Sequence, residues 1–111
     1  SLLTFLTAAK RDGKSVAAYG AAAKGNTLLN TCGVGTDMID YVVDASPHKQ
    51  GRFLPGSRLP IVAPGRLGET RPDYVLILPW NLRDEIIGQN SAVRDWGGRC
   101  VVPIPTTTVL P

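Results

Sequence analysis

The sequence predicts an α/β fold built on a mainly parallel sheet. Its apolar runs, such as residues 74–78, are short and continuous and do not alternate with polar residues, which indicates strands buried on both faces. Segments with helical spacing separate these runs, and glycines follow the expected helix ends. Right-handed crossovers then predict a Rossmann-like three-layer α-β-α sandwich whose five strands have the order 3-2-1-4-5.

Five segments rich in β-branched and apolar residues are expected to form the strands: 15–19, 38–43, 60–62, 74–78 and 99–102. Helices are expected at 2–11, at 21–32, for one or two turns within 64–70, and from a cap at Asn81 to about residue 96. The segment 45–59 is expected to be a loop, and the Pro/Thr-rich tail 103–111 is expected to be irregular.

Length and composition exclude several classes of protein. A chain of 111 residues can bury one hydrophobic core but not two, so we expect a single domain over residues 1–111. The 43% of hydrophobic residues are too many for a disordered tail, and no run approaches the ~20 apolar residues of a membrane helix. The two cysteines lie far apart and form no CxxC motif, and no signal peptide is recognisable, so a cytoplasmic protein is expected.

The charge distribution argues against nucleic acid as a partner. The formal net charge is only +3, and the basic residues are scattered along the chain. A nucleic-acid-binding protein usually has a denser basic stripe with interleaved aromatic residues. A small anionic ligand, such as a nucleotide, remains compatible with this charge.

The segment after the first strand is the strongest candidate site. It combines small residues, a cation and hydrogen-bonding side chains where a helix begins, and its candidate ligand contacts are Gly20, Ala21, Lys24, Gly25, Asn26 and Thr27. Such a helix start can bind an anion through free N–H groups. A tight turn of small residues, selected only for packing, explains the same pattern.

The loop departs from both well-known phosphate-binding motifs. Gly20 and Gly25 have the P-loop spacing, but Asn26 stands where that motif requires Lys. Ala22 stands where the dinucleotide motif requires its second Gly. ATP hydrolysis and ordinary NAD binding are therefore not predicted.

Further candidate contacts follow the second and fourth strands. Asp44 could hold sugar hydroxyls, as an acid does in NAD enzymes, or could cap the turn that follows it. Lys49 and Gln50 are candidate ligand contacts in the next loop, whereas His48 is expected to be solvated. Trp80 could stack on a base or a sugar, or could cover the core.

No catalytic constellation is recognisable. The sequence has no paired-carboxylate site, no HExxH motif, no Ser-His-Asp arrangement and no cysteine nucleophile, so we predict no catalytic residue and no metal ligand. Asp84 and Glu85 fit the first turn of a helix, where acids favour the dipole. The chain therefore has the features of a binding module.

Four segments, in order, resemble the C-terminal domain of S-adenosylmethionine (SAM)-dependent sugar-nucleotide C-methyltransferases. They are residues 19–30 (YGAAAKGNTLLN), 40–44 (DYVVD), 49–56 (KQGRFLPG) and 72–81 (PDYVLILPWN). The resemblance runs from about residue 14 to residue 105. It implies that this chain closes a longer methyltransferase, after a zinc-binding domain and a SAM-binding domain.

The resemblance also implies a division of labour. SAM, zinc and the catalytic groups would belong to the upstream domains, so this chain would bind no cofactor and have no activity alone. Its partners would be the SAM-binding domain of the same polypeptide and a nucleotide-linked keto-deoxysugar of the dTDP type. Sugar-nucleotide contact is carried over to Gly20, Ala21, Lys24, Gly25, Asn26, Thr27, Asp44, Lys49, Gln50 and Trp80.

Two other hypotheses stay open at this point. One is a stand-alone nucleotide- or CoA-binding domain with a regulatory role, and the other is a structural domain that binds only a protein partner. Neither membrane nor nucleic acid is expected as a partner in any of the three.

Overall fold

The computed structural model describes residues 1–111 and contains one six-stranded sheet with the order β3-β2-β1-β4-β5-β6. The first five strands run parallel and have the predicted order; they are β1 (Val16–Tyr19), β2 (Val42–Val43), β3 (Ile61–Val62), β4 (Tyr74–Ile77) and β5 (Arg99–Val102). The prediction of five strands was wrong, because β6 (Thr108–Val109) pairs antiparallel with β5.

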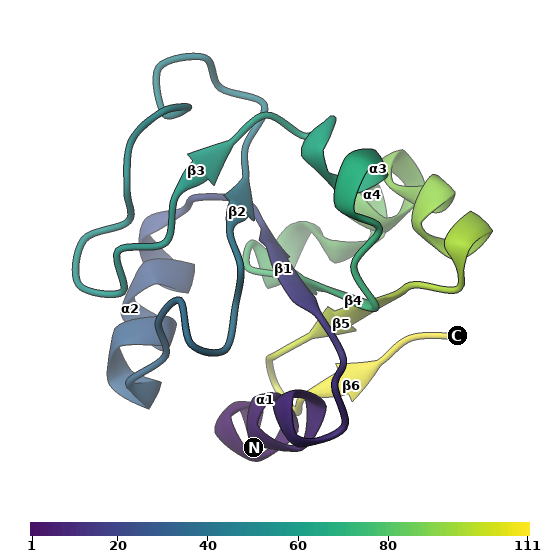
Figure 1. The fold of residues 1–111 in the computed structure, drawn as a ribbon. Helices are drawn as coiled ribbons and strands as arrows, with labels where there is room; N and C mark the ends of the chain where they lie inside the picture. Colours follow the sequence, from purple (N-terminus) through teal and green to yellow (C-terminus); the bar gives the residue numbers. More distant parts are fainter.

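Helices lie on both faces of this sheet (Figure 1). One face carries α1 (Leu2–Arg11) and α2 (Ala23–Cys32). The other carries α3 (Arg66–Thr70), α4 (Arg83–Gln89) and the 3-10 segment η2 (Ser91–Trp96). A second 3-10 segment, η1 (Trp80–Leu82), joins β4 to α4.

The strands feed two apolar clusters, one on each face. In β4, Leu76 joins the cluster under α1 and α2, whereas Val75 and Ile77 join the cluster under α3, α4 and η2. The fully buried residues are all apolar, and none is polar or charged. The sheet is therefore covered on each face by an apolar core made of residues from this chain.

A predicted strand and a predicted helix needed correction. The strand expected at 38–43 shortens to Val42–Val43, because residues 35–39 form a turn in which the Met38 and Ile39 amides donate to the Gly35 carbonyl. The helix expected at 81–96 breaks at Asn90, whose side-chain amide donates to the Ile86 carbonyl at 2.8 Å.

The other corrections concern a cap and the tail. Asn81 lies within η1 and makes no capping hydrogen bond, so its predicted role as the helix cap was wrong. The tail is not wholly irregular, since Val109 and Thr108 pair with Val101 and Val102 of β5. The open edge of β5 supplies the unpaired backbone groups that this pairing satisfies. Every helix is too short or too polar to span a membrane.

Candidate functional site

The candidate site lies at the carboxyl ends of β1 and β2. There the chain turns from β1 through Gly20, Ala21 and Ala22 into α2, while Asp44 follows β2. The Gly20 amide donates to the Val43 carbonyl at 2.8 Å, which joins the two strand ends. Parallel pairing thus brings together two segments that are far apart in the sequence.

Asp44 is the centre of a hydrogen-bonded cluster at this edge. Its Oδ2 accepts from the Ala21 amide at 2.8 Å, and its Oδ1 accepts from the Ser46 amide at 2.9 Å. Lys49 Nζ lies 3.7 Å from Asp44 Oδ2 and donates to the Ala21 carbonyl at 3.1 Å. Gln50 Nε2 donates to the Asp44 carbonyl at 2.8 Å. We call these five residues the Asp44 cluster.

The cluster unites predicted residues from three segments. The Asp44 side chain is 15% exposed, whereas that of Lys49 is 48% exposed. The Ser46 hydrogen bond confirms that Asp44 caps the turn that follows it. Contact between Asp44 and a sugar remains a prediction.

The two glycines of the loop are required by close internal packing. Gly20 has a φ of +92°, and a Cβ there would lie 2.5 Å from the Pro79 ring. A Cβ on Gly25 would lie 2.6 Å from Leu78 Cβ, so glycine lets α2 approach the end of β4. Packing therefore accounts for both residues, and ligand contact at either remains a prediction.

The first turn of α2 carries the remaining loop residues. Its N-cap, Ala22, has no side-chain acceptor for the free N–H groups at this helix end. Lys24 is exposed, and the exposed Thr27 donates its hydroxyl to the Ala23 carbonyl at 3.0 Å. Asn26 Oδ1 is buried without a hydrogen-bond partner. A cation, a hydroxyl and unpaired amides therefore lie within the first turns of one helix.

Trp80 lies in the connection between β4 and α4 and makes no hydrogen bond to the Asp44 cluster. It is half-buried and begins η1, and it directly follows Pro79, which packs against Gly20. His48 is exposed and makes no side-chain hydrogen bond. The packing of Pro79 against Gly20 could not be predicted from the sequence, because the two residues belong to segments that meet only in the folded chain.

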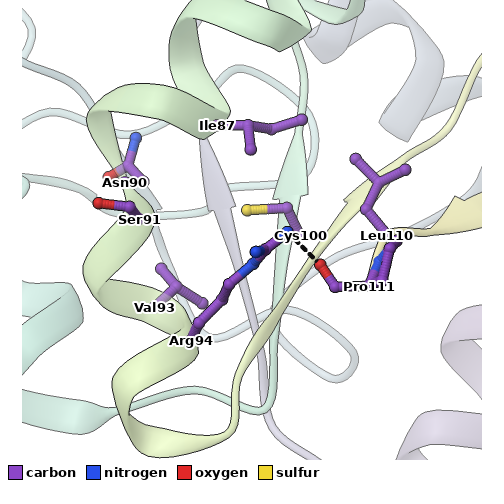
Figure 2. A pocket seen from close by; sticks show the side chains of 8 residues that line it. All are labelled: Ile87, Asn90, Ser91, Val93, Arg94, Cys100, Leu110 and Pro111. Carbon is purple, nitrogen blue, oxygen red and sulfur yellow. Dashed lines mark hydrogen bonds between the residues drawn. The ribbon is translucent and has the colours of Figure 1, made fainter.

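The main cavities of the molecule lie elsewhere. One cavity lies between the α4–η2 segment and the C-terminal residues, and Figure 2 shows its lining, in which Cys100 is central and Arg94 donates to the Pro111 carbonyl. Its volume is about 20 Å³. That volume suits about one water molecule. Four larger pockets, of about 130 to 320 Å³, are likewise lined by residues outside 20–27.

Titratable groups with shifted pKa values also lie outside the loop. Burial raises the pKa of the Cys100 thiol, and Arg94 opposes this shift. Burial also raises the pKa of Tyr41, while its hydrogen bond to Thr70 opposes the rise. No three His, Cys, Asp or Glu side chains gather closely enough to hold a metal ion.

The chain is a mostly parallel α/β domain with a polar cluster at the carboxyl edge of its sheet, the edge at which open α/β sheets generally bind ligands. The chain belongs to the C-methyltransferase C-terminal domain family, whose model matches residues 1–105. This match confirms the resemblance drawn from the four sequence segments.

The chain is also similar to a curated protein, the C-methyltransferase NovU of Streptomyces niveus. The two are 46% identical over 99 residues, which cover 89% of this chain and 24% of NovU. This chain thus spans about a quarter of the length of that relative.

Proposed function

We propose that this chain is the C-terminal sugar-nucleotide-binding module of a cytoplasmic, SAM-dependent C-methyltransferase. Its substrate would be a nucleotide-linked keto-deoxysugar of the dTDP type. The observation that carries the proposal is the exposed, uncapped start of α2 with Lys24 in its first turn, beside the Asp44 cluster. Membership of the family and the name of the relative NovU support the methyltransferase part.

The proposed binding mode follows from the charge of a nucleoside diphosphate. Free N–H groups and the helix dipole favour an anion at the start of α2, and Lys24 adds a full positive charge. Lys49 is half-exposed and adds a second cation at the same edge. We place the aromatic face of Trp80 against the base or the sugar. Gly20, Ala21, Gly25, Asn26, Thr27 and Gln50 complete the proposed contact surface.

The proposed reaction depends on carbon acidity in the substrate. A keto group acidifies the neighbouring sugar C–H bond, so a general base can remove that proton and leave a nucleophilic carbon. SAM supplies the methyl group, and we place SAM, zinc and the base in the other domains of the polypeptide. The contribution of this chain is to hold the nucleotide, so that binding energy away from the reacting carbon orients it. We also propose that the fold is a Rossmann-like three-layer sandwich.

The test is an NMR titration of the ¹⁵N-labelled 111-residue chain with dTDP, a dTDP-sugar, SAM, NAD and CoA. We expect the dTDP compounds alone to shift the resonances of residues 20–27. Lys24→Ala should weaken dTDP binding about tenfold, because it removes a charged donor. Lys14→Ala is the matched control, since Lys14 is exposed at the opposite end of β1.

Two outcomes would contradict the proposal. Shifts caused by NAD or CoA, and not by dTDP, would favour a regulatory nucleotide-binding domain. Equal losses in the Lys24 and Lys14 variants would show that the first turn of α2 is not the anion site.

A further inference from the structure

We propose that Asp44 is a positioning residue that fixes the shape of the loop before α2 and does not bind the 2′-hydroxyl of a nucleotide's ribose. This inference rests on the proposed nucleotide binding. It departs from the role of the acid that ends the second strand in NAD enzymes, which accepts a hydrogen bond from a ribose hydroxyl. The difference lies in what already surrounds the carboxylate in this chain.

The carboxylate of Asp44 is turned inward and already has partners. Its two oxygens accept from the amides of Ala21 and Ser46, and Lys49 Nζ adds a positive charge 3.7 Å from Oδ2. With only 15% of its side chain exposed, it offers little surface to a ligand. A carboxylate bound to backbone N–H groups and a cation is held in one position.

Ala21 is consequently held from both sides of its peptide unit. Its N–H donates to Asp44, and its carbonyl accepts from Lys49. The preceding residue, Gly20, is fixed as well, because its amide donates to Val43 and its α-carbon packs closely against Pro79. These contacts set the direction in which the chain begins α2. They therefore set where the free N–H groups of its first turn point.

If Asp44 holds the loop in this way, substitutions at Asp44 should affect different nucleotides in a characteristic pattern. A residue that acts on the loop affects every nucleotide alike, whereas a residue that reads the 2′-hydroxyl of ribose affects only nucleotides that carry that hydroxyl. Asn at position 44 keeps one acceptor but turns an NH₂ group toward the second amide. Asp44→Asn should therefore loosen the loop and weaken all nucleotides by a similar factor.

The first experiment needs no ligand. In the wild-type chain, NMR should detect a coupling across the hydrogen bond from the Ala21 amide nitrogen to the Asp44 carboxyl carbon. Amide exchange at Ala21 should become about tenfold faster in Asp44→Asn, because the protecting acceptor is lost. Asp40→Asn is the matched control, since Asp40 is exposed just before the same strand. Lys49→Met should shift the Ala21 and Ala22 resonances with the rest of the spectrum retained.

The second experiment compares dTDP with 5-methyluridine diphosphate, which differs only by the ribose 2′-hydroxyl. We expect affinities within about twofold of each other in the wild type, and a loss of about tenfold for both in Asp44→Asn. A preference for the ribose form that disappears in Asp44→Asn would overturn the inference. So would an unprotected, uncoupled Ala21 amide in the wild type. If neither nucleotide binds the wild type, the proposed function fails, while the coupling and the exchange rates still decide whether Asp44 clamps the loop.

Discussion

The two faces of the sheet are built differently. The face under α1 and α2 has helices of 10 residues each and a cluster of 15 buried residues. The face under α3 and α4 has helices of five and seven residues and a cluster of nine. Both groups with shifted pKa values, Tyr41 and Cys100, lie in the smaller cluster.

This difference explains where the candidate site can be held rigidly. The loop after β1 leads directly into α2, which approaches the sheet so closely that Gly25 touches Leu78. On α4, by contrast, Gly88 is exposed to solvent, and a Cβ there would meet nothing within 4 Å. The loop therefore takes its position from the close packing of α2 on the end of β4, whereas the solvent side of α4 tolerates an added methyl group.

The largest effect is expected from one substitution made on each face. Gly25→Ala should lower the free energy of unfolding by about 1–3 kcal/mol, because the new methyl group would overlap Leu78. Gly88→Ala should raise it by about 0.5–1 kcal/mol, since Ala favours a helix and no atom opposes its Cβ. Urea denaturation of both variants measures the two changes. Equal effects would show that α2 does not pack on Leu78 as closely as the structure indicates.

An intermediate effect on the free energy of unfolding is expected at Tyr41, which lies on the face under α3 and α4. Its hydroxyl lies 2.6 Å from the Thr70 hydroxyl, so Tyr41→Phe should cost about 0.5–1.5 kcal/mol at neutral pH. Burial raises the pKa of Tyr41 above its ordinary value of 10.0. Above pH 10 the unfolded chain loses this proton first, so the wild type loses stability that the variant does not have to lose.

Denaturation of wild type and Tyr41→Phe at several pH values tests this interpretation. The stability difference should be constant below pH 10 and should shrink as the pH rises further. Other titrating groups are common to both proteins and cancel in the difference. A difference that stays constant through this range would mean that the phenol is equally solvated in the folded and unfolded chains.

The sequence predicted those elements whose buried residues form a regular apolar pattern along the chain. The parallel order of the first five strands and the helix that ends at Gly33 follow from apolar runs, crossovers and glycine position. The strand β6 escaped prediction because Thr108 and Val109 are exposed and show no apolar period. Its pairing is dictated by the open edge of β5, which is a tertiary property. The break at Asn90 escaped for a related reason, since its amide competes for a helix carbonyl.

The candidate site was predictable in its place but not in its connections. Parallel topology alone brings the ends of β1 and β2 together, which is why Ala21 and Asp44 were expected at one edge. Whether Asp44 faces a ligand or its own chain depends on the conformation of the loop that contains Ser46 and Lys49. That loop has no repeating pattern from which its direction could be read.

The smallest expected effect is a difference in reactivity between the two free thiols, which probes the face of the sheet under α3 and α4. Cys32 on α2 is half-buried, whereas Cys100 is buried under the C-terminal segment, and the Leu110 amide donates to its carbonyl at 2.9 Å. Burial raises the pKa of the Cys100 thiol above its ordinary value of 9.0, so less of the reactive thiolate is present at neutral pH. Cys32 should therefore react first with a thiol reagent, and the rate at Cys100 should still rise as the pH passes 9.

Removal of residues 108–111 should speed the labelling of Cys100 on the order of tenfold and leave the rate at Cys32 unchanged, because only Cys100 loses its cover. Mass spectrometry of the labelled chain separates the two rates, and Cys32 serves as the internal reference. Equal labelling of Cys100 in the full and shortened chains would mean that the α4 and η2 side, rather than the C-terminal strand, shields the thiol. In that case α4 and η2, rather than the C-terminal strand, would close the smaller cluster over Cys100.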